Sequence, residues 1–165
     1  MKPITAIIKS KNMKYQMIMD SPLGKLLLME EDGALVKLSF RAECREAQIR
    51  ETPVLLEAKR QLEEYFKGER KVFDLPLNYE GTPFQHEVWD ALRKIPYGEV
   101  RSYKEIAEAI KRPKAFRAVG QAVHNNPIAL IVPCHRVIAS DGSLGGFAAG
   151  PETKMKILTL ENVIL

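Results

Sequence analysis

The chain has 165 residues, of which 45% are hydrophobic and 28% are charged, so it can bury a core as one domain or as two small ones. A membrane helix needs about 18 consecutive apolar residues, and no run in the sequence approaches this length. The first residues lack the apolar core of a signal peptide, so we expect a cytoplasmic protein without a membrane span. Two cysteines, Cys44 and Cys134, exclude a disulfide framework, and a reducing compartment suits a working thiol.

The net charge of +4 is unevenly placed along the chain. Residues 93–136 contain nine Lys or Arg and three Glu, so this segment is basic while the rest of the chain is slightly acidic. A basic segment of this kind indicates a polyanionic partner, such as a nucleic acid. The alternative is a solvated charged face, which is the commoner meaning of a single charge run.

Residues 14–40 alternate between apolar runs and turn residues, which predicts three strands at 15–19, 25–29 and 34–40 joined by hairpin turns. Thr52-Pro53 then begins a helix that Gly68 ends, with threonine as N-cap and proline at the first position. This part of the chain carries no phosphate loop or paired catalytic carboxylates, so we expect a structural α/β unit.

Residues 74–81 are predicted to form a linker, and Thr82-Pro83 begins a second helix with the same start signal. The sequence from Ser102 to Glu105 has the spacing of a capping box, which predicts a further helix from there. A short turn separates this helix from another, over about 114–124. The pair has a helix-turn-helix pattern, although many such pairs do not bind nucleic acid.

The helix over 114–124 has two different faces. Phe116, Val119 and Val123 are expected to pack inward, whereas Arg117 and Gly120 lie on the other face. A glycine inside a helix costs about 1 kcal/mol relative to alanine, which is tolerable where a ligand must approach closely. So thin a helix can enter the minor groove of DNA, which is about 6 Å wide. Packing of Gly120 against another helix is an equally good explanation.

The stretch from Ile131 to Ile138 places a thiol and an imidazole side by side among β-branched residues. We expect a strand over 129–132 before it and another beginning at Val137. Cys134 alone is more often a small buried hydrophobic residue than a nucleophile. Adjacent residues on a strand point to opposite faces, so contact between Cys134 and His135 requires a turn, a one-turn helix or a bridging water.

Two further features lie near the C-terminal end of the sequence. The loop 145–150 is rich in small residues and carries Phe147, so it can line a pocket for a flat ligand. A final helix begins near Pro151, and Glu161 stands at its end, where a carboxylate opposes the helix dipole unless it has a partner. We predict that Glu161 accepts a hydrogen bond from His135 and holds its tautomer.

The motifs YGEVRSY at 97–103, RAVGQA at 117–122 and NPIALIVPCHRVI at 126–138 closely resemble the O6-alkylguanine-DNA alkyltransferase family. The glycine loop and the trailing Glu161 add to the resemblance. It implies an α/β N-terminal domain over residues 1–78, with a small antiparallel sheet plus a helix in a ribonuclease-H-like fold. It also implies a mainly α, winged helix-turn-helix-like domain over residues 79–165 that binds DNA and transfers the alkyl group.

Members of the family are known to flip the damaged nucleotide out of DNA and to transfer its alkyl group irreversibly to their own cysteine. By resemblance, Cys134 is the nucleophile, and His135 is the base, acting through a water and oriented by Glu161. Tyr103 would donate a proton or hydrogen bond to the departing guanine, and Asn126 would tie the recognition helix to the active-site loop. The resemblance also implies a set of residues that contact DNA: Arg117, Ala118, Gly120, Gln121, Ser102 and Arg136. Among these, Arg117 would fill the gap left by the flipped base. The substrate pocket would be lined by Pro133, Val137, Phe147 and Ala148.

The expected partner is therefore double-stranded DNA containing O6-alkylguanine, with O4-alkylthymine as a second candidate substrate. We expect a monomer that needs no cofactor or metal. Phe147 and Ala148 depart from the tyrosine and serine that the family often has in this loop. These two changes bear on the range of alkyl groups that the pocket accepts.

Three other functions are consistent with parts of the pattern. A related class of alkyltransferase-like proteins senses damaged guanine without repairing it, but lacks the reactive cysteine. A winged-helix regulator would use its second helix in the major groove, usually as a dimer, and has no use for the Cys-His pair. A cysteine hydrolase would turn over repeatedly, whereas an alkyltransferase would act once.

Overall fold

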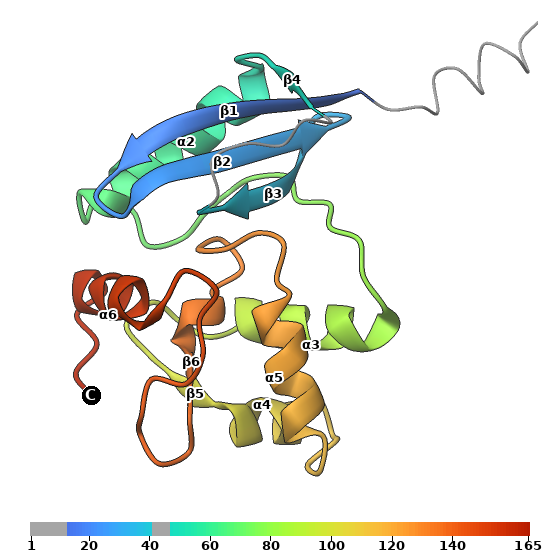
Figure 1. Ribbon diagram of the computed structural model, residues 1–165, viewed down its shortest axis with the longest axis vertical. Coiled ribbons are helices and arrows are strands. Elements are labelled where there is room, and N and C mark those ends of the chain that lie inside the picture. Colours follow the sequence, from blue (N-terminus) through green and yellow to red (C-terminus); the bar gives the residue numbers. More distant parts are fainter. Residues whose placement is uncertain (1–12, 41–46) are drawn as a thin grey trace, which may run out of the picture.

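The computed structural model of the protein describes residues 13–40 and 47–165, so Cys44 lies outside the described residues. The sheet and α2 form one half of the molecule and the remaining helices form the other (Figure 1). None of the helices in the described ranges is long and apolar enough to cross a membrane. In chain order the elements are β1 (Lys14–Ser21), β2 (Gly24–Glu31), β3 (Ala34–Ser39), β4 (Gln48–Ile49), α2 (Pro53–Phe66), α3 (Pro83–Arg93), β5 (Arg101–Ser102), α4 (Tyr103–Ala109), α5 (Phe116–His124), the 3-10 helix η1 (Cys134–Arg136), β6 (Val137–Ile138) and α6 (Pro151–Leu160).

The N-terminal sheet has the strand order β3-β2-β1-β4. The three predicted strands are confirmed as an antiparallel meander, and the short β4 adds to β1 in parallel, so the sheet is mixed. At the second hairpin, Asp32 and Gly33 both have positive φ, at 53° and 76°, as the two-residue turns that match strand twist require. The predicted turn chemistry therefore sets the register of the sheet.

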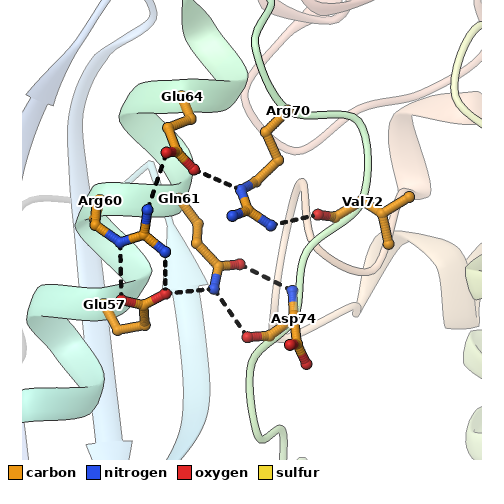
Figure 2. A network of polar contacts seen from close by, with 7 residues as sticks. All are labelled: Glu57, Arg60, Gln61, Glu64, Arg70, Val72 and Asp74. Carbon is orange, nitrogen blue, oxygen red and sulfur yellow. Dashed lines mark hydrogen bonds and ion pairs between the residues drawn. The ribbon is translucent and has the colours of Figure 1, made fainter.

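Helix α2 packs on one face of this sheet (Figure 1). The predicted start is confirmed, because the Thr52 side chain caps the Leu55 amide and Pro53 opens the helix. Its outer face carries an ion-pair and hydrogen-bond network that holds the following segment, residues 70–74, against the helix (Figure 2). Its inner face buries Leu55, Ala58, Leu62 and Tyr65.

The helices of the second half begin largely where their capping signals predict. Thr82 and Ser102 both form complete capping boxes, at the starts of α3 and α4. Helix α5 begins at Phe116, two residues later than expected, and has no side-chain cap. The expectation that Phe116 packs inward is wrong: it is 48% exposed, because the inward positions are Val119, Ala122 and Val123.

Strand β3 lies at one edge of the sheet, and backbone hydrogen bonds from this edge connect the two halves of the molecule. Leu35 exchanges backbone hydrogen bonds with Pro76 and Asn78, and Leu38 does the same with Pro127 and Ala129. After Ala129 the chain leaves the sheet. Leu130 has a φ of +69°, and residues 129–131 form a turn. The strand predicted over 129–132 is therefore wrong, since only Ile128 makes a bridge and the chain turns at once toward Cys134.

Candidate active site

Cys134 begins a single turn of 3-10 helix, η1, between the turn at 129–131 and strand β6. A one-turn helix at this position is one of the three arrangements that the sequence allowed for contact between Cys134 and His135. The thiol is 7% exposed and lines a cavity of about 1130 Å³, together with Tyr103, residues of α5 and the loop 146–149. Strand β6 pairs in parallel with β5, which fixes the turn against the start of α4. Cys134 thus lines a cavity whose walls also include α5 and the glycine loop, residues 145–150.

His135 follows Cys134 in the same 3-10 turn and is fully buried. Its Nε2 atom is 2.7 Å from Oε2 of Glu161, so the predicted contact between these residues is present. An ionised carboxylate only accepts hydrogen bonds, so Nε2 carries the hydrogen and Nδ1 has a free lone pair. Nδ1 has no hydrogen-bond partner within the described residues. Burial lowers the pKa of His135 below its ordinary value, although Glu161 opposes this effect, so the ring is neutral and can accept a proton.

Glu161 is held by more donors than the sequence indicated. Nε of Arg136 donates to Oε1 at 2.8 Å, Nη2 of Arg136 donates to Oε2 at 3.0 Å, and the Tyr65 hydroxyl donates to Oε2 at 2.5 Å. Burial alone would raise the pKa of Glu161, but the hydrogen bonds from His135, Arg136 and Tyr65 outweigh it and lower the pKa to about 2. The carboxylate is therefore anionic, and it directs the imidazole.

The expectation that Arg136 contacts DNA is wrong. Its guanidinium is buried, and besides the two bonds to Glu161 its Nη1 donates to the carbonyl of Ile95 at 2.8 Å. A side chain engaged on both sides inside the protein cannot reach a phosphate. Arg136 instead neutralises the buried charge of Glu161 through a forked contact, which is the geometry that arginine provides and lysine does not.

Asn126 occupies the predicted position between α5 and the cysteine turn. Its side-chain nitrogen donates to the carbonyl of Val132 at 2.7 Å, and its oxygen accepts from the Ile128 amide at 3.0 Å. Burial raises the pKa of the Cys134 thiol, while Asn126, the charge of Lys154 and nearby amides oppose the rise. The resting thiol is therefore protonated, and a base is needed to ionise it during reaction.

Lys154 is a buried cation beside the site that the sequence pattern did not indicate. Its ammonium donates to the carbonyls of Val137 and Leu144, both at 2.5 Å, and of Gly146 at 3.3 Å. Burial lowers the pKa of Lys154 to about 8, although a charged Cys134 would raise it. The lysine therefore ties the glycine loop to the strand that follows Cys134.

Tyr103, the first residue of α4, lines the cavity. A Cβ atom on Gly145, which has a φ of +71°, would lie 2.9 Å from the Tyr103 ring, so this loop position requires glycine. A Cβ on Gly120 would lie 3.8 Å from the same ring, an ordinary contact, so packing within the protein does not require glycine there. Burial raises the pKa of Tyr103, and the Gly146 amide opposes this effect, so the phenol keeps its proton.

The remaining predicted residues fall into two groups. On α5, Arg117, Ala118 and Gln121 are exposed and Gly120 is half-buried, so all four share an accessible face, while Ser102 caps α4 and is half-buried. Phe147 and Ala148 line the cavity as expected, and the Phe147 ring packs edge-on against Phe40 at 5.8 Å. Pro133 and Val137 are buried and are not among the described residues that line the cavity, so their place in the substrate pocket stays a prediction.

The sequence pattern missed three contributions to the site and its cavity. The N-terminal half provides Leu23, Lys37 and Phe40 to the cavity wall, and Tyr65 to Glu161. Lys154 had a detectable signal, because a lysine between apolar positions of a short helix is unusual. Tyr65 had none, since an aromatic residue on the inner face of a helix is indistinguishable from ordinary core.

Comparison with known proteins gives consistent matches. Residues 13–79 match the model of the 6-O-methylguanine DNA methyltransferase ribonuclease-like domain, and residues 83–163 match the DNA binding domain of the same family. A constitutive methylated-DNA–protein-cysteine methyltransferase of Bacillus subtilis is 47% identical over 161 residues, covering 92% of this chain and 97% of the relative. The corresponding protein of Methanosarcina barkeri is 50% identical, covering 89% and 96% of the two chains. The structure of Mycobacterium tuberculosis OGT in complex with DNA superposes with a TM-score of 0.84 at 44% identity, covering 89% of this chain and 92% of that one.

Proposed function

Because this chain belongs to the methylated-DNA–protein-cysteine methyltransferase family, a family of DNA repair proteins, we propose that Cys134 is the residue that takes the alkyl group from O6-alkylguanine. One observation carries the assignment. Cys134 lines the cavity together with residues of α5, and the adjacent His135 has a buried Nδ1 with no hydrogen-bond partner in the described part of the chain. A thiol that lines a cavity, with a proton acceptor next to it, is the arrangement that a one-step transfer to sulfur needs.

The proton path follows from the tautomer of His135. Nδ1 takes the Cys134 proton through a bridging water, and Glu161 stabilises the resulting imidazolium through Nε2. The thiolate sulfur then attacks the alkyl carbon, a sulfur–carbon bond forms, and the bond from carbon to O6 breaks. Guanine leaves with that electron pair and takes a proton from the Tyr103 hydroxyl at the ring. The thioether on Cys134 is a very poor leaving group, so each molecule reacts once.

The exposed face of α5 is the proposed contact with the damaged duplex. Gly120 lets the helix axis approach the minor groove closely, because no side chain stands between the backbone and the base edges. Arg117 fills the gap in the stack after the alkylated guanine has turned out into the cavity. Lys37 also lines the cavity, so the N-terminal half places a cation beside the same nucleotide.

The division of labour follows the two halves of the molecule. Residues 79–165 carry the transfer chemistry and most of the DNA contacts. Residues 1–78 form the supporting domain and add Lys37 beside the nucleotide, and the protein acts as a monomer. Phe147 stacks on the flipped base from the loop side, and Ala148 leaves room beside the alkyl group where a serine would place a hydroxyl. On this basis O4-alkylthymine is the second substrate, because its smaller ring fits the same cavity.

The test is mass spectrometry of the intact protein after mixing with a duplex that contains one O6-methylguanine. We expect one methyl group per molecule, located on Cys134 and not on Cys44, and no further turnover. Cys134→Ala should abolish transfer and retain DNA binding. Binding without transfer by the wild-type protein would indicate a damage sensor, and several turnovers per molecule would indicate a hydrolase.

A further inference from the structure

Tyr65 brings the N-terminal half of the molecule into the hydrogen-bond chain of His135 and Glu161. It lies on the inner face of α2, is fully buried, and donates its hydroxyl to Oε2 of Glu161 at 2.5 Å across 96 residues of sequence. A buried tyrosine hydroxyl needs an acceptor, and a backbone carbonyl usually provides one. Here the acceptor is the carboxylate that also binds the proposed base.

The shared acceptor atom ties the position of Tyr65 to that of His135. Oε2 of Glu161 accepts from Nε2 of His135 at 2.7 Å, from the Tyr65 hydroxyl, and from Nη2 of Arg136 at 3.0 Å. Three donors converging on one oxygen leave the carboxylate a single orientation. Since the imidazole plane follows that oxygen, the donors also determine where Nδ1 points.

We propose that Tyr65 is a positioning residue for alkyl transfer: it holds Glu161 in the orientation that directs Nδ1 of His135 toward the Cys134 thiol. This inference rests on the proposed roles of Cys134 and His135. Under it, the N-terminal domain does more than support the fold, because one of its side chains completes the chain of groups that ionises the thiol. Tyr65 itself touches neither substrate nor the reacting atoms.

The surroundings of Tyr65 fit a residue whose position is fixed. Its ring lies among the rings of Phe66 at 5.4 Å, Phe73 at 5.2 Å and Tyr97 at 6.2 Å, so it cannot tilt away from Glu161 without disturbing the core. Burial and the charge of Glu161 raise the pKa of Tyr65, so the hydroxyl remains a neutral donor across the working pH range. Tyr97, by contrast, donates to the backbone carbonyl of Leu160.

A double-mutant cycle on the transfer rate tests the inference. The substrate is free O6-benzylguanine, so that DNA binding does not enter, and the rate is measured in single turnover with the full-length chain. Tyr65→Phe should slow transfer about tenfold, because a hydrogen bond to a charged group is lost. In a His135→Gln background, whose amide can still donate to Glu161 but cannot accept a proton, Tyr65→Phe should have no further effect.

The matched control is Tyr79→Phe, which removes the same atom from another buried tyrosine. Its hydroxyl contacts the Asp90 carboxylate at 3.4 Å, away from the site, so the rate should be unchanged. Equal losses from Tyr65→Phe in both backgrounds, or no loss in either, would overturn the inference. Failure of Cys134→Ala to abolish transfer would instead overturn the proposed function, so the two failures can be told apart.

The pH dependence of the rate is a second readout, and it also covers the case in which Tyr65→Phe does not fold. The charged and titratable groups around the His135–Glu161 pair are Arg136, Lys154, Cys134, Tyr65 and Tyr97. Without the Tyr65 hydroxyl the carboxylate attracts the imidazolium more strongly, so the acid limb of the profile should move to higher pH. Replacing Tyr65 by 3-fluorotyrosine keeps the fold and strengthens the donor, so the limb should move to lower pH. An acid limb that stays at its wild-type position in either folded variant would overturn the inference.

Discussion

Replacing Arg136 by methionine should unfold the protein more readily rather than weaken its hold on DNA. Arg136 and Glu161 are 6% and 1% exposed, and the guanidinium makes two hydrogen bonds to the carboxylate and one to the Ile95 carbonyl. Removing one partner of a buried ion pair leaves the other charge uncompensated, which typically costs about 3–5 kcal/mol. For a chain of this size the melting temperature should then fall by about 6–20 °C.

The assay is thermal and urea unfolding followed by circular dichroism, with Arg117→Met as the matched control. Arg117 is exposed and makes no ion pair or side-chain hydrogen bond with the residues that the structure describes, so its removal should change stability by less than about 0.5 kcal/mol while weakening duplex binding. Adding Glu161→Gln to Arg136→Met should recover part of the lost stability, because the stranded charge is removed with its partner. An Arg136→Met protein of wild-type stability and reduced DNA affinity would refute the reasoning and restore Arg136 to the DNA surface.

Four further outcomes are expected. Gly145→Ala should slow single-turnover transfer by displacing Tyr103, whereas Gly142→Ala, which has a positive φ but no neighbour within 4 Å, should not; equal rates would argue against the collision. Arg117→Ala should reduce the rate with duplex substrate but not with free O6-benzylguanine, and should lower the log–log salt slope of duplex affinity by about 0.9. The pKa of Glu161 lies at about 2, below the ordinary 4.5, so the stability that its carboxylate gives the folded state is complete above pH 4.5 and is lost as pH falls through 2. Urea unfolding should therefore show that Glu161→Gln loses less stability in acid than the wild-type protein. The pKa of Lys154 lies at about 8, below the ordinary 10.5, so the free energy of unfolding should rise as pH increases between these two values. When unfolding is measured at pH 7.5 and 10.5, Lys154→Met should lack this rise.

Local signals predicted the parts of the fold that local chemistry determines. Thr52, Thr82 and Ser102 each begin a helix where a hydroxyl caps the first amides, and Asp32-Gly33 turns the second hairpin. These features depend on residues within a few positions of one another. The pairing of Glu161 with His135 was also predictable, because a carboxylate at the wrong end of a helix dipole needs a cation or donor nearby.

The errors arose where a distant segment decides the outcome. The β-branched residues before Pro133 have the composition of a strand, yet the chain turns at Leu130 because Ile128 is already paired with β3. Arg136 lies in a basic segment, but the buried carboxylate of Glu161 attracts it inward. Tyr65 contacts Glu161 without any sequence signal that separates it from core residues. Contacts of this kind depend on the tertiary fold, and a short stretch of sequence does not show which distant residues will be its neighbours.

The pairing of the β3 edge with residues 127–129 also bears on how the chain folds. Leu38 and Ile128 are joined across most of the chain, and Tyr65 reaches Glu161 across 96 residues. Closing such long loops costs conformational entropy before any contact repays it, so these pairings belong to late stages of folding. On the proposed mechanism, a partly folded molecule whose long loops are still open has a cysteine without an oriented base. We therefore expect the thiol to become reactive only after these long-range contacts have formed.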